Sequence, residues 1–444
     1  MRRPGRRLRA RLALVTATIC VAAAVSSCGG AGTLAAPDIS GSDFGRNATG
    51  TVQLWVRAAT QAGSAPIVAR FNKSHPHLKV VMTAIPDTQY VTKFATAVRG
   101  RSVPDVVDVD DIFSTLLAFH KSLTDIGPLV DKLPYRSRLS KAHLDLARFG
   151  DGVYGVPYLA DISLLYYNKT LFRRAGLDPD KPPTTLAELL RDARRINALG
   201  KGVSGFSFGG NSPGIMGFTG LPSVWSSRNY LFTGPLAHQR AHIEDNPALR
   251  RMLTFYRAAW QDRLSSASSR TETGATWGKD FLAGKVGVWP GNEGALTAAG
   301  LTPAFAKQMG VAALPGAVSG TSTFAGGDNI AIPRGAKNAS GAWEYIQYAL
   351  RVSQQQTLPK SGFTPIRSDV ASPVFAKQFP RTAVALRVLG RGYAPKTLAY
   401  NTAVNQLGSP FFEMFTSAVF GRGVAPAMRK AQSGFERSLL QAES

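Results

Sequence analysis

Residues 51–111 read TVQLWVRAATQAGSAPIVARFNKSHPHLKVVMTAIPDTQYVTKFATAVRGRSVPDVVDVDD and set out the fold. Three apolar segments of this stretch have strand character, namely residues 51–56, 78–82 and 106–109. Between them, apolar side chains recur at helical spacing: Ile67, Val68 and Phe71 after Pro66, then Tyr90, Phe94, Ala97 and Val98. A strand–helix–strand–helix–strand order predicts parallel strands joined by right-handed crossovers, which is an α/β fold.

The first residues have the pattern of an export signal. Six arginines lie within residues 2–11, and residues 12–25 are apolar but too few for a confident membrane span. The small residues Val25-Ser26-Ser27 then precede Cys28, as in a bacterial lipobox. We expect residues 1–27 to be a removed signal peptide and Cys28 to carry lipid. The alternative is an ordinary signal peptide that happens to contain Cys28.

The charge of the chain is strongly basic, but it does not indicate nucleic acid. Removing the six leading arginines lowers the formal charge from +24 to +18. The remaining Lys and Arg residues are scattered, without the basic runs or basic–aromatic repeats of a nucleic-acid surface. A basic surface facing an anionic cell envelope explains the charge better.

The mature chain is expected to fold without disulfides. Cys20 leaves with the signal and Cys28 takes lipid, so no cysteine pair remains. Residues 28–50 are small and polar and are predicted to form a flexible tether. The length that remains is too great for one core and suggests two large lobes.

Asp110 and Asp111 end the third predicted strand and are the sharpest polar feature. In an open α/β sheet, ligands bind beyond the carboxyl ends of the strands. Carboxylates there could accept hydrogen bonds from sugar hydroxyls, act as general acid and base, or hold a cation such as calcium. The alternative is that one of them only caps the helix that follows.

Tryptophans near loops are a second signal. Trp225, Trp277 and Trp289 lie at strand ends or in Gly-rich loops, and an indole can stack on the apolar face of a pyranose. Packing in a core is an equally good explanation for any one of them. Residues 205–209 read GFSFG, but their neighbours show no strand–turn–helix pattern, so we do not expect a nucleophile elbow there. The sequence has no zinc-protease motif, no P-loop and no dinucleotide fingerprint between a strand and a helix. A glycosidase with two carboxylates distant in the chain stays open.

Several segments together resemble a known family. In chain order they include VQLWV, PDVVDVDD, GVYGVPYLADISLLYYNKTLFRRAGL, PPTTLAELL, FLAGKVGVWPGN, FAGGDNIAIP and GFTPIR. With this order the chain resembles the extracellular solute-binding proteins of bacterial ABC importers, in the branch that serves sugars and related solutes. The resemblance covers nearly the whole mature chain. It departs at Leu186, where the family usually has Trp, and this bears on packing alone.

The resemblance implies a periplasmic-binding-protein-like fold, in which two α/β lobes joined by hinge crossings enclose a ligand cleft. The first crossing would be Gly155-Val156-Pro157, and the others would lie in TFAGGDN and GFTPIR. Lobe 1 would then comprise residues 51–157 and about 327–364. Lobe 2 would comprise residues 158–326 and about 365–444.

The resemblance also implies a set of cleft residues. They are Arg57, Asp110, Asp111, Tyr158, Asp161, Trp225, Trp277, Trp289, Asn292, Gly327, Asp328 and Arg367. Asp110 or Asp111, with Asp328, would accept hydroxyl hydrogen bonds, and Trp289 would stack on a sugar ring. Arg57 and Arg367 would donate paired bonds to hydroxyls or to a phosphate, as in a glycerophosphodiester.

The predicted function is that of a lipid-anchored binding protein outside the cytoplasm. It would capture a sugar or polyol-type solute by lobe closure and deliver it to the transmembrane subunits of a permease. No catalysis, cofactor, metal or nucleic acid is expected. Three alternatives remain: a secreted glycan hydrolase using cleft carboxylates, a binder of glycerophosphodiesters, and a sensory or adhesive envelope lipoprotein.

Overall fold

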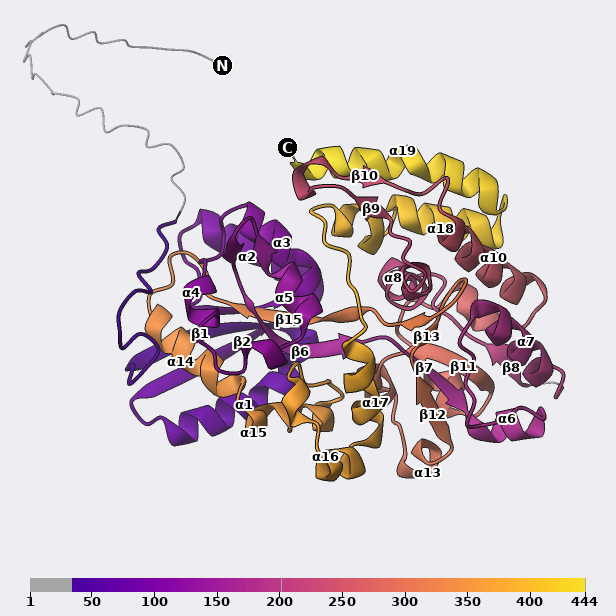
Figure 1. The fold of residues 1–444 in the computed structure, drawn as a ribbon, viewed down its shortest axis with the longest axis horizontal. Coiled ribbons are helices and arrows are strands. Elements are labelled where there is room, and N and C mark those ends of the chain that lie inside the picture. The colour runs from indigo at the N-terminus through magenta and orange to yellow at the C-terminus, as the bar shows by residue number, and fades with distance from the viewer. Residues whose placement is uncertain (1–33, 201, 444) are drawn as a thin grey trace, which may run out of the picture. The chain divides into compact units, whose positions relative to one another are not determined.

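Two main β-sheets organise the computed structural model, which describes residues 34–200 and 202–443 (Figure 1). The first sheet has five strands in the order β2-β1-β3-β15-β6, and the second has four in the order β12-β7-β11-β8. We call the elements around the five-stranded sheet the first lobe and those around the four-stranded sheet the second lobe. The predicted signal peptide, residues 1–27, and Cys28 lie outside the described residues.

The first sheet confirms the predicted α/β pattern. Its strands are β1 (Gly50–Arg57), β2 (Leu78–Ile85), β3 (Val106–Asp110), β15 (Ala325–Ala331) and β6 (Val156–Ile162). Strand β1 pairs in parallel with β2 and β3, whereas β15 runs antiparallel to both of its neighbours. The crossovers pass through α1 (Gln61–Ser74) and α2 (Asp87–Arg99). The carboxyl ends of β1 and β3 therefore lie at one edge of this sheet.

Helix α1 begins before the proline that was expected to open it. Pro66 lies inside the helix and has no N–H to donate to the carbonyl of Ala62, four residues earlier. The hydroxyl of Ser361 donates to that carbonyl at 2.8 Å instead. A side chain distant in sequence therefore satisfies the group that the proline leaves free, and the helix continues through it.

The second sheet mixes strand directions. Its strands are β7 (Leu164–Asn168), β8 (Ser204–Phe206), β11 (Val286–Gly291) and β12 (Met309–Ala312). Strand β11 is antiparallel to β7 and parallel to β8. Helix α7 (Leu186–Asn197) begins with a capping box, since Thr185 and Glu188 bond each other's backbone. Helix α10 (Pro247–Gln261) begins after its N-cap Asn246.

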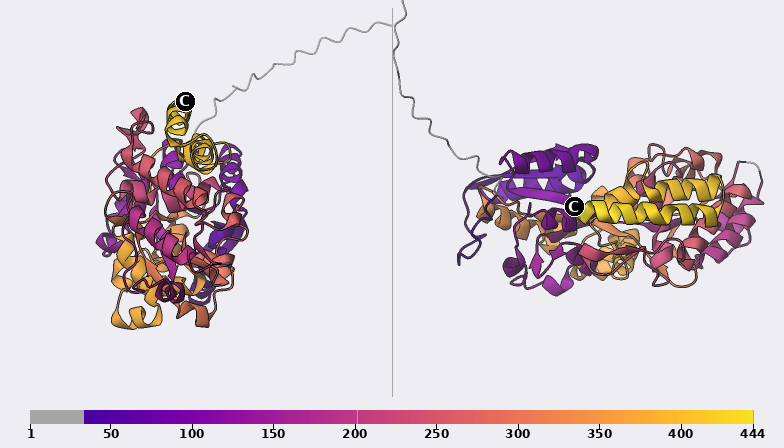
Figure 2. Two further views of the ribbon diagram at one scale, coloured as in Figure 1. Left: turned by 90° about the vertical axis from the view of Figure 1, so that its right-hand side faces the viewer. Right: turned by 90° about the horizontal axis from the view of Figure 1, so that it is seen from above.

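The C-terminal helices α18 (Pro410–Phe420) and α19 (Val424–Glu443) lie side by side against the second lobe (Figure 2, right). The other helices are α3 (Asp111–Phe119), α4 (Gly127–Val130), α5 (Lys141–Leu146), α6 (Lys169–Arg174), α8 (Pro213–Gly220), α9 (Pro222–Trp225), α11 (Lys279–Leu282), α12 (Glu293–Ala298), α13 (Pro303–Ala306), α14 (Ala339–Ala349), α15 (Val352–Gln355), α16 (Pro373–Gln378) and α17 (Pro380–Leu389). Short ribbons pair β4 (Arg148–Phe149) with β5 (Gly152–Val153), β9 (Phe232–Thr233) with β10 (Arg240–Ala241), and β13 (Leu314–Pro315) with β14 (Thr321–Ser322).

The first crossing between the sheets lies later in the chain than expected. Residues 156 and 157 are still paired with β15, and β6 stays in the first sheet to Ile162. The register of β6 against β15 shifts at Tyr158, and such a bulge tolerates the missing N–H of Pro157. The Gly-Val-Pro corner is thus a bulge within a strand, and the assignment of residues 155–157 as the crossing is wrong.

The chain changes sheets at Ser163, between β6 and β7. It returns at Thr323 and Phe324, just before β15. The Ser163 hydroxyl accepts from the Phe324 N–H at 2.9 Å, and the Thr323 hydroxyl donates to the Ser163 carbonyl at 2.6 Å. Two crossings are therefore bonded to each other where they leave the sheets.

Residues 34–49 do not form the free tether that was predicted. The N–H of Gly45 donates to Ser340, and the N–H of Ala48 donates to Glu344 at 2.8 Å. The Gly45 carbonyl in turn accepts from Gln347. These partners lie on α14, so this segment packs against the first lobe. Within residues 34–200 and 202–443, no helix is long and apolar enough to cross a membrane.

Candidate functional site

A cavity of about 1040 Å³ lies where the carboxyl ends of β1 and β3 face the second lobe. The first lobe contributes Arg57, Asp110 and Asp111, and the second contributes Trp277 and Asn292 among others. Its volume is at the upper end of the range for small-molecule sites, roughly 300–1,000 Å³. We call this cavity the cleft. Seven of the twelve residues predicted from the sequence line it: Arg57, Asp110, Asp111, Asp161, Trp277, Asn292 and Gly327.

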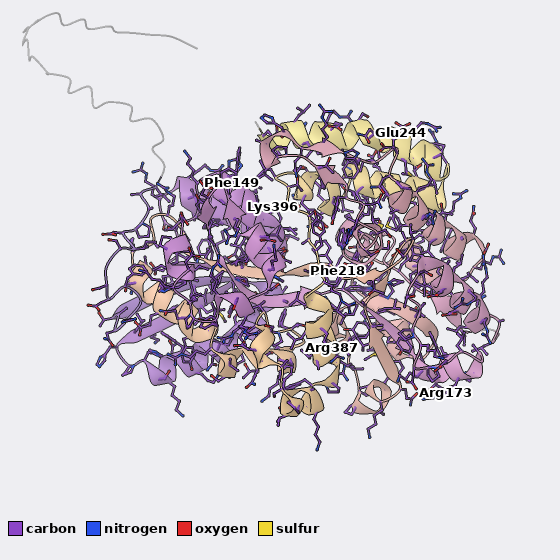
Figure 3. All side chains as sticks on the ribbon, in the orientation of Figure 1. Phe149, Arg173, Phe218, Glu244, Arg387 and Lys396 are labelled. Carbon is purple, nitrogen blue, oxygen red and sulfur yellow. The ribbon has the colours of Figure 1, made fainter. Side chains whose placement is uncertain are left out.

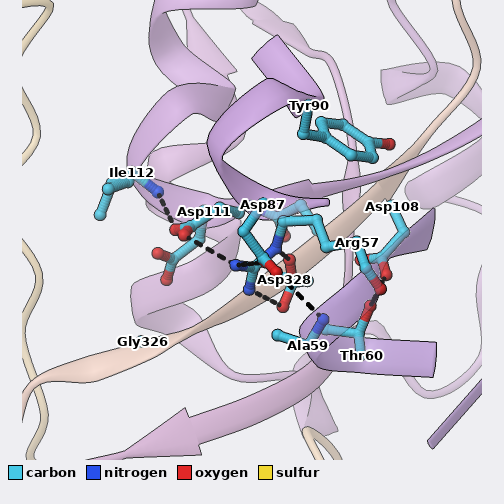
Figure 4. A network of polar contacts seen from close by, with 12 residues as sticks. Arg57, Ala59, Thr60, Asp87, Tyr90, Asp108, Asp111, Ile112, Gly326 and Asp328 are labelled. Atoms are coloured by element: carbon cyan, nitrogen blue, oxygen red, sulfur yellow. Dashed lines mark hydrogen bonds and ion pairs between the residues drawn. The ribbon is translucent and has the colours of Figure 1, made fainter. Parts of the chain in front are cut away.

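Arg57, at the end of β1, is the centre of an ion network (Figure 4). Its Nε donates to Asp328 Oδ1 at 2.6 Å and its Nη2 to Asp328 Oδ2 at 2.8 Å. Its Nη1 lies 3.0 Å from Asp87 and 3.3 Å from Asp110. Three carboxylates thus surround one guanidinium, which leaves it little capacity for a ligand.

Asp110 is both a helix cap and a cleft residue. Its side chain accepts from the N–H of Ile112 at 3.3 Å, so the alternative of capping holds for this residue. Burial raises the pKa of Asp110 to about 6, although the Arg57 guanidinium opposes this shift. The carboxyl group lies in the cleft wall and holds its proton more readily than an exposed Asp does.

Asp111 has no hydrogen-bond partner for either carboxylate oxygen among the residues described, although its side chain is fully buried. The nearest basic group is Nε2 of His143, 3.7 Å away. That nitrogen lies 3.1 Å from the carbonyl of Gly326, which can only accept, so Nε2 carries a proton directed at Gly326. Burial lowers the pKa of His143 to about 4, so the ring is neutral near pH 7. Both oxygens of Asp111 are therefore unpaired in the cleft wall, and burial together with the Asp110 and Asp328 carboxylates raises the pKa of this group.

Asp161 and Asn292 meet across the two lobes. Nδ2 of Asn292 donates to Asp161 Oδ2 at 2.9 Å, while its Oδ1 accepts from the N–H of Ala295 as the N-cap of α12. Burial raises the pKa of Asp161 to about 7, with the Arg57 guanidinium opposing and the Asp328 carboxylate adding to the shift. The pair gives the cleft a donor and an acceptor whose positions depend on both lobes.

Aromatic side chains cover the second-lobe side of the cleft. Trp277 and Phe218 both line it and pack edge to face with their ring centroids 6.5 Å apart; Phe218 is labelled near the centre of Figure 3. The Nε1 of Trp277 has no hydrogen-bond partner in the described part of the chain. These rings provide the apolar surface that one face of a sugar ring requires.

Trp289 and Trp225 were predicted to face the ligand, but the structure places both in cores. Trp289 is 1% exposed, and its ring centroid lies 4.9 Å from that of Trp277 and 5.9 Å from that of Phe281. Trp225 is buried, and its Nε1 donates to Ser322 at 3.1 Å. Alternation along β11 turns Trp289 away from the cleft, so it supports Trp277 from behind.

Gly327 lines the cleft in a conformation that requires glycine. Its φ is +138°, and a Cβ would lie 2.3 Å from the carbonyl oxygen of Leu159 on β6. The close approach of β15 to β6 at this point therefore depends on the missing side chain.

Three further predicted residues act beside the cleft and do not line it. Tyr158 is fully buried and donates to Ser64 at 3.0 Å. Asp328 is fully buried behind Arg57, which uses both of its oxygens. Arg367 is paired with Asp369, donates to the carbonyl of Leu350, and lies 3.8 Å from the ring centroid of Tyr135. The donors of Arg367 hold the third crossing together, so the prediction that it contacts ligand is wrong.

Sequence reasoning missed several cleft residues, including Asp87, Phe218, Lys360 and Tyr400. Asp87 could have been found, because it follows β2 as Asp110 follows the core of β3, at the carboxyl end of a parallel strand. Phe218 and Tyr400 come from segments without regular patterning, so no local signal identified them. No group of His, Cys, Asp and Glu able to hold a metal occurs in residues 34–200 and 202–443.

Comparison with known proteins shows which family the sequence matches. Residues 57–356 match the family of bacterial extracellular solute-binding proteins. The sn-glycerol-3-phosphate-binding periplasmic protein UgpB of Brucella abortus is 29% identical over 145 residues, which is 31% of this chain and 33% of that protein. The multiple sugar-binding protein of Streptococcus mutans is 31% identical over 133 residues, or 30% of each chain. The match thus spans about a third of the length of these curated relatives.

Solved structures of low identity share the fold. The sugar-binding protein MalE of Xanthomonas citri superposes with a TM-score of 0.78 at 22% identity, over 88% of this chain and 98% of that one. UgpB of Mycobacterium tuberculosis, in complex with glycerophosphocholine, superposes with a TM-score of 0.70 at 22% identity, over 88% and 99%. These similarities confirm the predicted two-lobed α/β fold.

Proposed function

Because the chain belongs to the family of bacterial extracellular solute-binding proteins, we propose that it captures a sugar or polyol-type solute in the cleft. The observation that carries this proposal is the lining of the 1040 Å³ cavity, where carboxyl groups of the first lobe face aromatic rings and amide groups of the second. Hydroxyl groups need such acceptors and donors, and the apolar face of a sugar ring needs such rings.

The proposed roles follow from the positions of the cleft residues. Asp110, Asp111 and Asp161 would accept hydrogen bonds from hydroxyls, Asn292 would donate them, and Trp277 would stack on the ring. Arg57 would hold the carboxylates in place and offer at most one N–H. In this proposal Gly327 keeps the backbone close to the solute, and Asp328 acts through Arg57.

Closure of the lobes is the proposed mechanism. A solute held by Asp111 on one side and Trp277 on the other contacts both lobes, so it stabilises the closed arrangement over the open one. The bonded crossings at Ser163 and Phe324 provide the hinge. We infer that the first lobe comprises residues 34–162 together with the segment from Ala325 to about Arg367. The second lobe would comprise residues 164–323 and the remaining C-terminal segment.

The partners and the anchor follow from the family. The closed form would deliver the solute to the transmembrane subunits of an ABC importer driven by a separate ATPase. The family is extracellular, and we propose that lipid on Cys28 holds the chain at the membrane surface. The loss of lipid labelling in Cys28→Ser in the producing cell would test the anchor.

A glycerophosphodiester is the second candidate, because relatives such as UgpB are named for a related solute. The cations available in the cleft are Arg57, whose donors are largely used by carboxylates, and Lys360, which is exposed. The geometry therefore favours a neutral polyol over a phosphate. Turnover of a glycan by the purified protein would favour the hydrolase alternative instead.

The test is a thermal-shift panel with the full chain purified in detergent. Sugars, polyols, amino sugars and glycerophosphodiesters are compared, and each compound is recovered and checked for conversion. A ligand at a hundred times its Kd stabilises the folded state by about 2.7 kcal/mol, which raises Tm visibly. A saturable shift without conversion supports the proposal, and a panel without any shift contradicts it.

A further inference from the structure

The cleft is acidic, although the chain as a whole carries a formal charge of +24. Four carboxyl groups line it, from Asp87, Asp110, Asp111 and Asp161, against the two cations Arg57 and Lys360. Burial raises the pKa of three of these carboxyl groups, so their ionised forms are stabilised most by a cationic partner. Carboxylates crowded in one cavity raise the local cation concentration and repel anions. The sign of the cleft is thus opposite to that of the protein that carries it.

The cationic groups of the cleft do not neutralise all four carboxylates. Arg57 donates to Asp328 through two nitrogens and to Asp87 through the third (Figure 4). The third nitrogen also lies 3.3 Å from Asp110. Since Asp328 is fully buried and already takes one full charge of the guanidinium, little positive charge remains for the carboxylates in the cleft wall. Lys360 is exposed to solvent and its charge is screened.

Asp111 is the carboxylate that most clearly lacks a partner. Its side chain is 0% exposed, and neither oxygen accepts a hydrogen bond from any described residue. His143 supplies no charge, because its ring is neutral and its Nε2 proton is directed at the carbonyl of Gly326. The first turn of α3 gives some stabilisation through the helix dipole but no hydrogen bond. Burial, together with the Asp110 and Asp328 carboxylates, raises the pKa of Asp111 well above its usual range. Ionising this carboxyl group without a donor is therefore costly, and a cationic ligand group is the partner that would stabilise its ionised form.

We infer that the solute carries a protonated amine that pairs with Asp111, so that amino sugars or other amine-bearing polyols are preferred and phosphorylated solutes are rejected. This inference rests on the proposed function, because it assumes that the cleft receives a polyhydroxylated solute. An ammonium offers three donors to Asp111 and its neighbours, whereas a hydroxyl offers one. Charge-assisted hydrogen bonds are also roughly twice as strong as neutral ones.

The test compares three disaccharides of the same ring size by calorimetry with the full chain in detergent. They are the β-linked disaccharide of glucosamine, its N-acetylated form, and cellobiose. Cellobiose has hydroxyls where the first has amines, and acetylation removes the charge but keeps the nitrogen. We expect the amine form to bind about ten times more tightly than either of the others. Glycerophosphocholine, which carries a phosphate, is expected to bind more weakly than the amine form.

Two measurements test whether Asp111 causes the tighter binding of the amine form. In Asp111→Asn, which keeps the shape and removes the charge, the amine form should lose more affinity than cellobiose, so that the ratio of the two affinities falls toward one. In the unaltered protein, rising salt should weaken binding of the amine form and leave cellobiose unaffected. The salt measurement needs no variant, so it holds even if Asp111→Asn fails to fold.

The outcomes separate this inference from the proposed function. Equal binding of the three disaccharides, or tighter binding of cellobiose or of glycerophosphocholine, overturns the inference; saccharide binding in these cases leaves the proposed function intact. An amine preference that persists in folded Asp111→Asn overturns the assignment to Asp111. Failure of every saccharide to bind overturns both.

Discussion

Arg57 and Asp328 form a two-point ion pair, with Nε to Oδ1 at 2.6 Å and Nη2 to Oδ2 at 2.8 Å. Arg57 ends the strand β1, and Asp328 lies on β15, 271 residues later in the chain. The pair therefore joins the N-terminal unit of the first lobe to the segment that returns from the second. It fixes the guanidinium around which Asp87 and Asp110 are arranged.

Replacing Asp328 with Asn should destabilise the protein. The substitution leaves the charge of Arg57, whose side chain is 16% exposed, without its closest partner. Removing one member of a buried pair costs about 3–5 kcal/mol, and the amide recovers part of this through hydrogen bonding. We expect a loss of about 2–4 kcal/mol in the free energy of unfolding, measured by urea denaturation.

The matched control is Asp180→Asn, which breaks a surface pair between Asp180 and Lys169. The Asp180 side chain is 79% exposed, so its loss should cost less than about 1 kcal/mol. If both variants lose the same stability, the buried pair is not the link between the two segments that we describe.

Gly327→Ala should lower the free energy of unfolding by more than the cost of placing alanine at a positive φ. The added Cβ would lie 2.3 Å from the Leu159 carbonyl oxygen, so β15 and β6 would have to separate beside the cleft. Gly284→Ala is the control, because Gly284 also has a positive φ, +73°, but nothing lies within 4 Å of its Cβ. We expect Gly327→Ala to lose about 1–3 kcal/mol more than the control in denaturation experiments. Equal losses would mean that the sheet absorbs the methyl group.

The two adjacent tryptophans should respond differently to substitution. Trp277→Ala should weaken solute binding by about three- to tenfold with a smaller effect on stability, because Trp277 lines the cleft. Trp289→Ala should lower the free energy of unfolding by about 3–5 kcal/mol, because Trp289 is 1% exposed in a packed cluster. Trp260→Ala, a partly buried Trp outside the cleft lining, serves as the binding control. The reverse ranking for Trp277 and Trp289 would restore the stacking role that the sequence suggested for Trp289.

The spacing of apolar residues predicted the first sheet, because it differs between strands and helices and indicates which face of each element is buried. The same local signals located Asp110 and Asp111, since the end of a parallel strand is visible in the sequence. Neither signal shows where a strand crosses between sheets. Pro157 suggested a corner, and only its pairing with β15 shows that it lies at a bulge.

The burial of Trp289 and the partners of Arg367 could not be predicted from local sequence either, because both depend on residues far away in the chain. Trp289 contacts Tyr166, and Arg367 packs on Tyr135. Short-range patterns can suggest that an aromatic or basic residue is functional. Long-range packing decides whether it faces a ligand or a core.

The pH dependence of stability should reveal the buried Asp161. Burial raises the pKa of Asp161 to about 7 in the folded protein, whereas an unfolded Asp has a pKa of 3.8. Between these values the folded state holds a proton that the unfolded state has released, so the contribution of this group to stability is lost as the pH rises. It is fully present below pH 3.8 and gone above about pH 7. Because of this group, the free energy of unfolding should fall by up to about 1.4 kcal/mol for each pH unit in this range.

Asp161→Asn should therefore flatten the decline in stability between about pH 4 and pH 7 for the ligand-free protein. Part of the slope should remain, because burial also raises the pKa of Asp110 to about 6. Free energies of unfolding from urea titrations at a series of pH values measure the effect, and Asp180→Asn controls for the loss of a surface carboxylate. If Asp161→Asn and the unaltered protein have parallel profiles, Asp161 is ionised in the folded cleft. Asn292 would then donate across the two lobes to an ionised carboxylate rather than to a protonated carboxyl group.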